Sequence, residues 1–468
     1  MTGLFHEDTL LKNTGADGLA RALFEVARDL PLICPHGHTD PAWFAQNHAF
    51  PDPSALIVTP DHYITRMFAS QGMSLEDFGV ARTDGTGNAP DPRAIWQRFA
   101  SNYHLFRGTP TRLWLDITFD RLFGLKQPLS AQTADDAYDR IAEALASPGF
   151  RPRALYETFN IEVLATTDSA LDDLAHHRSI KESGWTGRVI PTYRPDQVTD
   201  PDHEGFARAL DQLGELTGED TGTWVGYLAA HQSRRDFFRS MGATATDHGI
   251  PDARTADLAQ SEAAALFDRI RRDAATGDDV ALFRAQMLTE MARMSAQDGM
   301  VMQIHPGSSR NHNRAVFERY GRDKGFDIPV QTEFTRSLAP LLNAVGDAPD
   351  LRIVLFTLDE TAYARELAPL AGAWPSLVLG PAWWFHDSAE GMRRFREMTT
   401  ETAGIYNTAG FNDDTRAFPS IPARHEVARR VDCAWLARLV ADHRLREDEA
   451  FEMIEELSCG LARRTYRL

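Results

Sequence analysis

The sequence has few cysteines, no long apolar run and no excess of positive charge. Only Cys34, Cys433 and Cys459 occur among 468 residues, which excludes a disulfide framework and is typical of a reducing compartment. No apolar run approaches the roughly 18 residues that a membrane-spanning helix needs. The first residues show no basic segment followed by an apolar one, so we expect no secretory signal peptide. These absences predict a cytoplasmic protein.

Acidic residues outnumber basic ones. The 67 Asp and Glu residues against 49 Lys and Arg residues give a formal net charge of −18. Such a chain is repelled by nucleic acids and by anionic membrane surfaces, so we expect neither as a partner. An anionic substrate would therefore need a local basic site. The length and the apolar content of 43% suffice for one large core.

Short apolar or β-branched runs recur along the chain, and most end in polar residues. We expect strands at residues 31–35, 161–165, 188–192, 243–246, 300–304, 353–356, 377–379 and 405–411. From the second run onward, helical patterns separate them, for example at 224–238 and 253–294. This alternation predicts the α/β class and a (β/α)₈ TIM-like barrel, whose reactive residues gather at the carboxyl ends of the strands. An open doubly wound sheet is the alternative, but no glycine-rich nucleotide motif follows the first strand.

The first two predicted strands are far apart in the sequence. We expect residues 61–149 to form a mainly helical insertion over the barrel mouth, and residues 1–60 and 150–468 to form the metal-dependent barrel domain. Helical patterns at 426–443 and 448–463 predict helices at the C-terminal end.

Two histidines, His36 and His38, follow the first predicted strand. Side chains on a strand alternate between its faces, so residues two apart point the same way. Two imidazoles on one face can bind a divalent transition metal. The alternative is that one histidine caps the strand and the other is solvated.

Further polar motifs stand in order along the chain. They are His36-Gly37-His38, Asp61-His62-Tyr63, Thr166-Thr167-Asp168, Tyr193-Arg194-Pro195-Asp196, Asp236-Phe237-Phe238, Thr246-Asp247-His248-Gly249, Gln303-Ile304-His305 with Arg310-Asn311, Trp383-Trp384-Phe385, Asp414-Thr415-Arg416 and Arg424-His425-Glu426. Together they resemble the motifs of uronate isomerases, the sugar-acid aldose–ketose isomerases of the metal-dependent amidohydrolase superfamily. The resemblance also implies self-association into a homo-oligomer.

The resemblance implies that His36, His38 and Asp414 bind one divalent metal ion, and Zn²⁺ is the expected ion. Binuclear relatives carry a carboxylated lysine at the end of the fourth strand, where this chain has Thr246-Asp247-His248. A single metal is therefore favoured. For Asp414 alone, a helix N-cap is the alternative. The neighbouring Asp413 would face away from the site on a strand, and we do not expect it to be a ligand.

The implied reaction interconverts D-glucuronate with D-fructuronate, and D-galacturonate with D-tagaturonate. A proton moves from C2 to C1 through a cis-enediol, which requires a positioned base, and Asp414 is the candidate. Tyr63 would carry a proton between the C1 and C2 oxygens, because a phenol both donates and accepts. His62 would orient either group. A residue at the rim of the site is the alternative for Tyr63, and an exposed histidine at a helix start is the alternative for His62.

An arginine must receive the substrate carboxylate, because its planar fork matches a carboxylate in two hydrogen bonds. Arg194 and Arg416 are the candidates, although Arg194 could instead form a structural ion pair with Asp196 or Asp168. His305 is expected to contact the substrate. Trp383 is a candidate wall of the sugar pocket, with core packing as its alternative. Four further residues could orient these side chains through hydrogen bonds without contacting the substrate: Asp168, Asp247, His248 and Asp359.

Two other functions stay open at this point. A mononuclear metal-dependent hydrolase on the same scaffold would use Asp414 to activate water against a lactone, ester or amide. A non-catalytic protein that binds sugar acids would leave the pairing of Asp414 with Tyr63 without a purpose.

Overall fold

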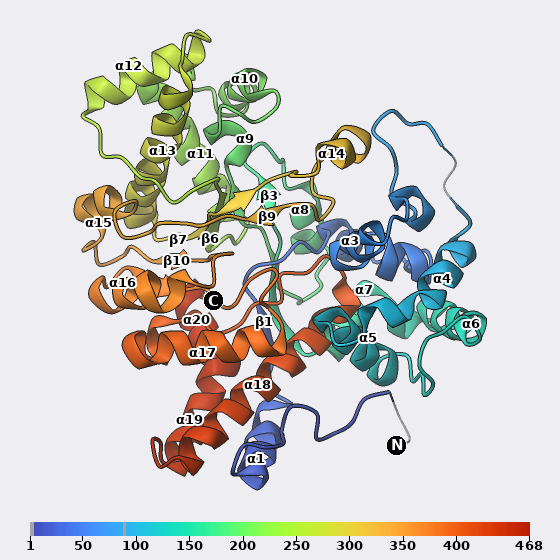
Figure 1. The fold of residues 1–468 in the computed structure, drawn as a ribbon. Coiled ribbons are helices and arrows are strands. Elements are labelled where there is room, and N and C mark those ends of the chain that lie inside the picture. Colours follow the sequence, from blue (N-terminus) through green and yellow to red (C-terminus); the bar gives the residue numbers. More distant parts are fainter. Residues whose placement is uncertain (1–3, 88–89) are drawn as a thin grey trace.

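The computed structural model describes residues 4–87 and 90–468. The first three residues of the segment considered for a signal peptide therefore lie outside the described chain. Short strands occupy the interior and helices surround them (Figure 1). One sheet has the order β1-β2-β4, with β1 at Leu32–Cys34, β2 at Ile161–Ala165 and β4 at Val189–Ile190. The second has the order β11-β10-β7-β6-β5-β3, with bounds of Leu377–Leu379, Ile353–Leu355, Val301–His305, Ala245–Gly249, Tyr193–Arg194 and Asp168–Ser169.

All strand pairs within these two sheets are parallel, so the chain has an α/β fold with parallel sheets, as predicted. Seven of the predicted strand regions contain a strand. Residues 243–246 mark only the start of β6, which continues through Asp247 and His248 to Gly249. The ladders among the described residues form two open sheets and one small antiparallel pair, β8 (Ser308–Ser309) with β9 (Ile328–Pro329), rather than a closed barrel.

The expected strand at residues 405–411 is wrong. This segment contains a 3₁₀ turn at Ile405–Asn407 and a single parallel bridge between Thr408 and Leu379. Gly404 and Gly410 have φ values of 69° and 80°. Backbone in this left-handed region interrupts the extended conformation at both ends of the run, so no ladder can form along it.

Helices fill the long segment between β1 and β2, and their apolar side chains pack into a cluster that includes Phe68, Trp96 and Phe99. The α-helices are α2 (Pro41–Gln46), α3 (His62–Ser70), α4 (Pro92–Ser101), α5 (Pro110–Arg121), α6 (Ala134–Ala146) and α7 (Pro152–Thr158). Shorter turns are η1 (Ser54–Val58), η2 (Leu75–Phe78), η3 (Tyr103–Phe106) and η4 (Pro148–Phe150). In Figure 1 most of these elements, from α3 to α7, gather on one side of the strands.

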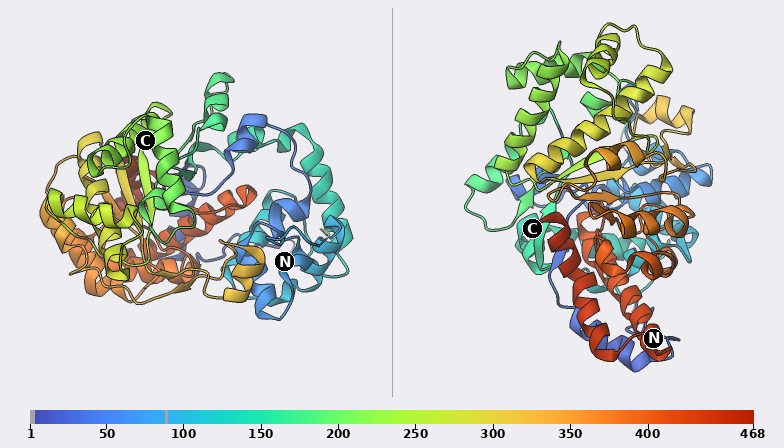
Figure 2. Two further views of the ribbon diagram at one scale, coloured as in Figure 1. Left: turned by 90° about the horizontal axis from the view of Figure 1, so that it is seen from above. Right: turned by 90° about the vertical axis from the view of Figure 1, so that its left-hand side faces the viewer.

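Helices also alternate with the later strands. They are α8 (Ala175–Glu182), α9 (Asp196–Thr199), α10 (Phe206–Thr217), α11 (Trp224–Ser240), α12 (Gln260–Arg271), α13 (Gly277–Asp298), α14 (Arg314–Tyr320), α15 (Ala339–Val345), η5 (Tyr363–Leu367), α16 (Ala368–Ala373) and α17 (Ala389–Ala403). The last elements are η7 (Phe418–Ser420), α18 (Ile421–Ala441), α19 (Glu447–Glu455), η8 (Glu456–Gly460) and α20 (Leu461–Tyr466). Helices α18 and α19 pack beside α1 (Asp17–Ala27), so the two ends of the chain share one apolar cluster (Figure 2). Among the described residues, no helix combines the length and apolar character needed to span a bilayer.

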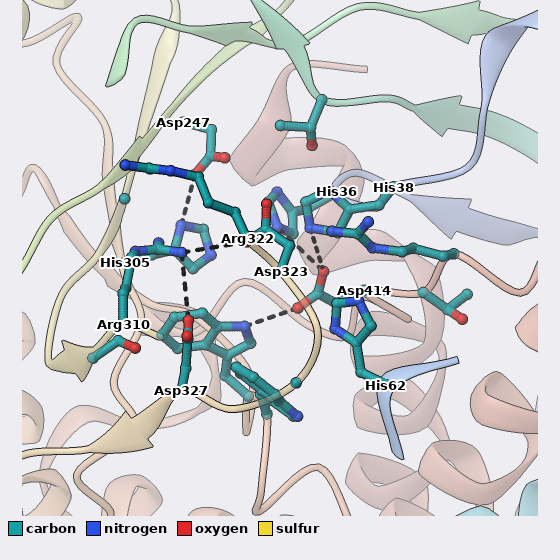
Figure 3. A pocket seen from close by; sticks show the side chains of 18 of the residues that line it. His36, His38, His62, Asp247, His305, Arg310, Arg322, Asp323, Asp327 and Asp414 are labelled. Atoms are coloured by element: carbon teal, nitrogen blue, oxygen red, sulfur yellow. Dashed lines mark hydrogen bonds and ion pairs between the residues drawn. The ribbon is translucent and has the colours of Figure 1, made fainter. Parts of the chain in front are cut away.

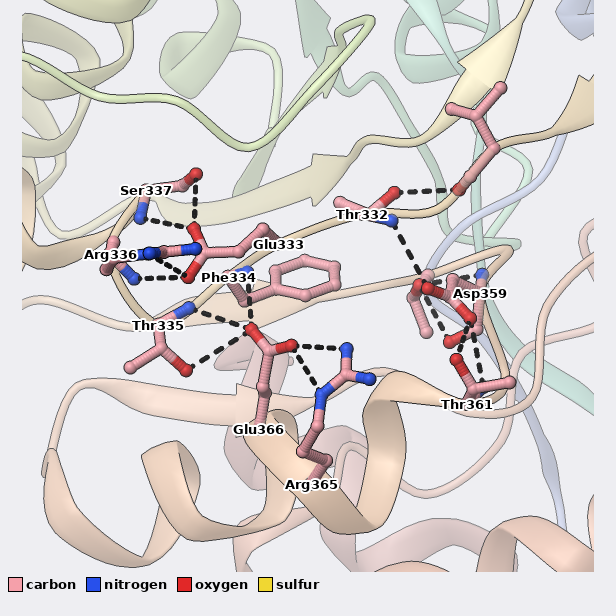
Figure 4. A network of polar contacts seen from close by, with 12 residues as sticks. Thr332, Glu333, Phe334, Thr335, Arg336, Ser337, Asp359, Thr361, Arg365 and Glu366 are labelled. Carbon is pink, nitrogen blue, oxygen red and sulfur yellow. Dashed lines mark hydrogen bonds and ion pairs between the residues drawn. The ribbon is translucent and has the colours of Figure 1, made fainter.

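Buried carboxylates fix the chain that leads from β9 to α15 (Figure 4). Glu366 accepts hydrogen bonds from the backbone N–H groups of Phe334 and Thr335 at 2.7 and 3.0 Å. Asp359 accepts one from Thr332 N at 3.2 Å. Asp359, a candidate support of the site on sequence grounds, is thus bonded within this network. The network thus fixes residues 332–335 within the segment that connects β7 to β10.

Candidate active site

The carboxyl ends of the strands open into a cavity of about 420 Å³. The residues that the sequence assigned to catalysis, substrate binding or metal binding all line it. They are His36, His38, His62, Tyr63, Arg194, His305, Trp383, Asp414 and Arg416. Figure 3 shows His36, His38 and Asp414 pointing toward one another from opposite ends of the chain.

His36, His38 and Asp414 form a compact group of donor atoms. Oδ1 of Asp414 lies 3.4 Å from Nε2 of His36 and 3.2 Å from Nε2 of His38. Tetrahedral ligands at about 2.0–2.1 Å from one zinc ion are roughly 3.3 Å apart, so these separations fit a shared divalent ion. Buried Oδ1 of Asp414 also has no hydrogen-bond partner among the described residues. Because an unpaired buried carboxylate oxygen is costly, the group has the character of a metal-binding cluster.

Asp414 is held in a strained backbone conformation. Its φ is 41°, in the left-handed region that non-glycine residues rarely adopt. Its Oδ2 accepts a hydrogen bond from Nε1 of Trp383 at 2.8 Å. Burial by itself would raise the pKa of Asp414, but the adjacent imidazoles of His36 and His38 outweigh it and hold the pKa well below its usual value. Asp414 does not cap a helix, because η7 follows Ala417.

Asp413 faces away from this group, as expected. Its Oδ2 lies 3.3 Å from Nε2 of His425, which is in turn 3.7 Å from Sγ of Cys34. All three side chains are buried. The two neighbouring carboxylates thus lie on opposite sides of the backbone. Because the contact of Asp413 with His425 is buried, it helps to hold the Asp414 side chain toward His36 and His38.

His305 lies at the end of β7 and is buried. Its Nδ1 is 2.7 Å from Oδ1 of Asp247, and its ring stacks on Phe356 and on His36 with centroid distances of 4.1 and 4.7 Å. His36, Asp247 and His305 form a second group of closely spaced donor atoms. His305 is therefore within reach of either a metal ion or a bound substrate. Burial raises the pKa of Asp247 and the nearby Arg194 lowers it, and the resulting pKa lies well below its usual value.

The two candidate arginines differ in their partners. Arg194 is paired with Asp196 at 2.8 Å and with Asp247 at 3.3 Å, so the structural ion pair considered from the sequence is present, with Asp196 rather than Asp168. Arg416 is exposed, lines the cavity and makes no ion pair with the described residues. Arg416 is therefore the cation better placed to receive an anionic group.

The local sequence at the start of α3 explains the placement of His62 and Tyr63. Asp61 is the N-cap, and its side chain accepts hydrogen bonds from Tyr63 N and Ile64 N. The first turn of α3 thereby turns both side chains into the cavity. Burial lowers the pKa of His62 to about 3, so its imidazole is neutral at physiological pH. Tyr63 donates its hydroxyl proton to Asp387 at 2.8 Å.

Sequence reasoning missed the pocket residues of the excursion between β8 and β9. Arg322, Asp323 and Asp327 line the cavity together with Arg310, which was noted only as part of a motif (Figure 3). Their segment contains no apolar run that would mark a strand end, so no local pattern could have identified them. Asp387 was also missed, and its position shortly after the Trp383-Trp384-Phe385 motif was the only available signal.

Comparison with known proteins agrees with this geometry. A model of the glucuronate isomerase family matches residues 1–466. The chain belongs to this family. It is 63% identical to a uronate isomerase of Rhizobium meliloti (strain 1021), with all of both chains covered. It is 64% identical to one of Mesorhizobium japonicum, with 96% of each chain covered.

Solved structures of the family share the fold. The crystal structure of glucuronate isomerase from Caulobacter crescentus matches with a TM-score of 0.97 at 55% identity, covering 99% of this chain and 97% of that one. A uronate isomerase from Thermotoga maritima matches with a TM-score of 0.91 at 28% identity, covering 99% of each. The α/β fold described above is thus the fold of this isomerase family.

Proposed function

We propose that this cavity interconverts D-glucuronate with D-fructuronate, and D-galacturonate with D-tagaturonate, by moving a proton from C2 to C1 through a cis-enediol. The observation that carries the proposal is the meeting of Asp414 with His36 and His38, at 3.4 and 3.2 Å, beside an exposed arginine. Membership of the glucuronate isomerase family supports the choice of substrate. The alternative, a metal-dependent hydrolase, has no comparable support.

Asp414 acts as the base in this proposal. An ionised carboxylate at this position can accept the C2 proton and return it to C1. Its two oxygens have separate neighbours, with Oδ1 toward the histidines and Oδ2 toward Trp383. Oδ2, on the Trp383 side, would be the oxygen left for the substrate if Oδ1 helped to hold a metal ion.

His36, His38 and Asp414 would hold one divalent ion, which we propose to be Zn²⁺. The ion supplies Lewis-acid polarisation of a substrate oxygen when bound. A single ion fits the absence of lysine from β6, whose sequence is Ala-Thr-Asp-His-Gly. His305 stays a proposed substrate contact.

The substrate carboxylate is received by Arg416, and Arg194 has a secondary part. Arg194 is already paired with two carboxylates, so it contributes mainly to the positive potential and to the orientation of Asp247. The neutral imidazole of His62 can bond to substrate hydroxyl groups without adding charge. Trp383 forms a wall of the same cavity.

We further propose that the two sheets are parts of one (β/α)₈ barrel. Strands β2 and β3 are separated only by Thr166 and Thr167, and β4 and β5 only by Pro191 and Thr192. Hydrogen bonds continue across both breaks, from Thr166 N to Ile190 O at 2.9 Å and from Asp168 N to Thr192 O at 3.1 Å. A bond from His38 N to Thr415 O at 3.1 Å and the bridge from Thr408 to Leu379 link the remaining edges.

Several finer expectations stay predictions. They are the division into residues 1–60 with 150–468 and an insertion at 61–149, assembly into a homo-oligomer, a cytoplasmic location, and the absence of nucleic-acid and membrane partners. Size-exclusion chromatography with light scattering tests the assembly directly.

Incubation with D-glucuronate in D₂O, followed by NMR, tests the proposed reaction. We expect the ketose to form, and the Asp414→Asn variant to lower kcat by on the order of 10²–10⁴ because the base is lost. A matched Asp347→Asn variant, altered at an exposed carboxyl outside the cavity, should behave as wild type. Turnover of a lactone or an amide without ketose formation would instead support the hydrolase.

A further inference from the structure

Tyr63 and Asp387 form a hydrogen-bonded pair at the wall of the cavity. The phenol oxygen of Tyr63 lies 2.8 Å from Oδ1 and 2.9 Å from Oδ2 of Asp387. Tyr63 comes from the first turn of α3, and Asp387 from the loop between β11 and α17, so tertiary structure alone brings them together. Both residues line the cavity that contains Asp414. The phenol proton is therefore directed toward Asp387.

Arg424 of α18 fixes the other side of this carboxylate. Its Nη1 lies 3.4 Å from Oδ2 of Asp387 and also donates to Asp413 O at 3.2 Å. Its guanidinium stacks on Trp114, 3.8 Å from the ring centroid. With Trp114 also in edge contact with Tyr63, the carboxylate has little freedom to turn away from the phenol.

The proposed isomerisation requires two proton movements, and Asp414 accounts for only one. The C2 proton moves to C1, while the hydroxyl proton on O2 must move to O1. A phenol whose own proton is donated to a carboxylate presents a lone pair of its oxygen to the cavity. Such a phenol can accept the O2 proton only if it passes its own proton to the carboxylate.

We propose that Asp387 is a positioning residue for Tyr63 and the temporary holder of its proton; this inference rests on the proposed function. As the C2–H bond breaks and the C1–C2 double bond forms, the aldehyde oxygen O1 takes a proton from Tyr63, which recovers one from O2. Alternatively, Tyr63 passes its own proton to Asp387 in the same step in which it accepts the O2 proton, and the proton held by Asp387 then returns through Tyr63 to O1. Both routes leave Tyr63 neutral, Asp387 ionised and the proton count unchanged.

The electrostatic surroundings agree with this role. Burial raises the pKa of Tyr63 well above its usual value, so a free phenolate in the cavity is unfavourable and the phenol must exchange its protons in concert. Burial also raises the pKa of Asp387 to about 6, although Arg424 and Tyr63 act in the opposite direction. A carboxyl with that pKa accepts a proton readily near neutral pH.

A double-mutant cycle with Asp387→Asn and Tyr63→Phe tests the proposal. We expect each single variant to lower kcat on D-glucuronate by on the order of 10² with little change in KM, and the double variant to be no slower than Tyr63→Phe alone. In Asp387→Asn the oxygen-to-oxygen transfer becomes limiting. The isotope effect of C2-deuterated substrate should therefore fall toward one while the solvent isotope effect rises. Asp387→Glu, which keeps the carboxylate, should recover part of the rate.

Several outcomes would overturn the proposal. An equal loss of kcat from Asp387→Asn in the wild-type and Tyr63→Phe backgrounds would mean that Asp387 acts through Arg424 or the fold. Unchanged isotope effects would exclude a proton-holding role. Melting temperature and metal content, compared with those of Tyr406→Phe at an exposed phenol, identify variants that fail to fold. If wild type forms no ketose, the proposed function itself fails, and this result is separate from the cycle.

Discussion

Trp383 donates its indole N–H to Oδ2 of Asp414 at 2.8 Å, while Oδ1 of the same carboxylate faces His36 and His38. The two oxygens of the Asp414 carboxylate therefore have different neighbours. A carboxylate that binds a metal loses basicity, and a role as ligand and base therefore requires its oxygens to be distinguished. Trp383 provides the distinction by fixing the rotation of the carboxylate.

Replacing Trp383 by phenylalanine should separate orientation from metal binding. Trp383→Phe keeps an aromatic ring but removes the donor, and loss of one such hydrogen bond of about 1.5 kcal/mol corresponds to roughly a tenfold decrease in kcat. Metal content should stay unchanged. Steady-state kinetics and elemental analysis measure both quantities, with Trp374→Phe, outside the cavity, as the matched control. Loss of metal from Trp383→Phe would contradict the assignment.

The histidines should determine metal occupancy. His36→Ala and His38→Ala each remove one of the two imidazoles next to Oδ1 of Asp414, so we expect both purified proteins to contain far less metal than wild type. Elemental analysis checks this, and His104→Ala, altered at an exposed histidine, is the control. Full metal occupancy in both variants would reject the ligand assignment.

Much of the site could be predicted because it follows strand ends. His36 and His38 directly follow β1, and the parallel order of the strands brings His305 to the same edge. The pairing of Tyr63 with Asp387 could not be predicted, because it depends on how α3 meets the loop after β11. Only tertiary packing determines such a contact.

Two elements show where local patterns fail. The run at residues 405–411 is apolar enough for a strand, yet glycines with positive φ on both sides of Thr408 leave only a bridge. The segment with Arg322 and Asp323 carries no periodic pattern, and it is closed by a bond from the N–H of Asn311 to Oδ1 of Asp327 at 2.7 Å, between residues 16 positions apart. A sequence pattern reports local conformation, whereas these features depend on non-local partners.

Removal of each arginine charge should affect substrate binding to a different extent. Arg416 has no ion-pair partner among the described residues, so Arg416→Met should raise KM for D-glucuronate by about tenfold or more, with a smaller change in kcat. Arg194→Met should also raise KM, but less, because Asp196 and Asp247 already engage its guanidinium. Arg272→Met, at the exposed C-cap of α12, is the control. A larger effect at Arg194 would reverse the assignment of the carboxylate contact.

Asp168 should make the stability of the folded protein depend on pH. This carboxyl is buried, and burial raises its pKa to about 7 although Thr166 donates a hydrogen bond to it at 2.7 Å. The unfolded chain releases the same proton near pH 4, so between about pH 4 and 7 the folded state binds more protons than the unfolded state. The free energy of unfolding must therefore fall as pH rises through this range, and the effect of this single group is of the order of 2–4 kcal/mol.

Asp168→Asn cannot titrate, so its unfolding free energy should decline less between these pH values than that of wild type. Urea unfolding of both proteins with a chelator present, so that metal release does not contribute, measures the difference. The exposed Asp347→Asn variant should keep the wild-type slope, and equal slopes for Asp168→Asn and wild type would show that Asp168 is ionised in the folded protein throughout this range.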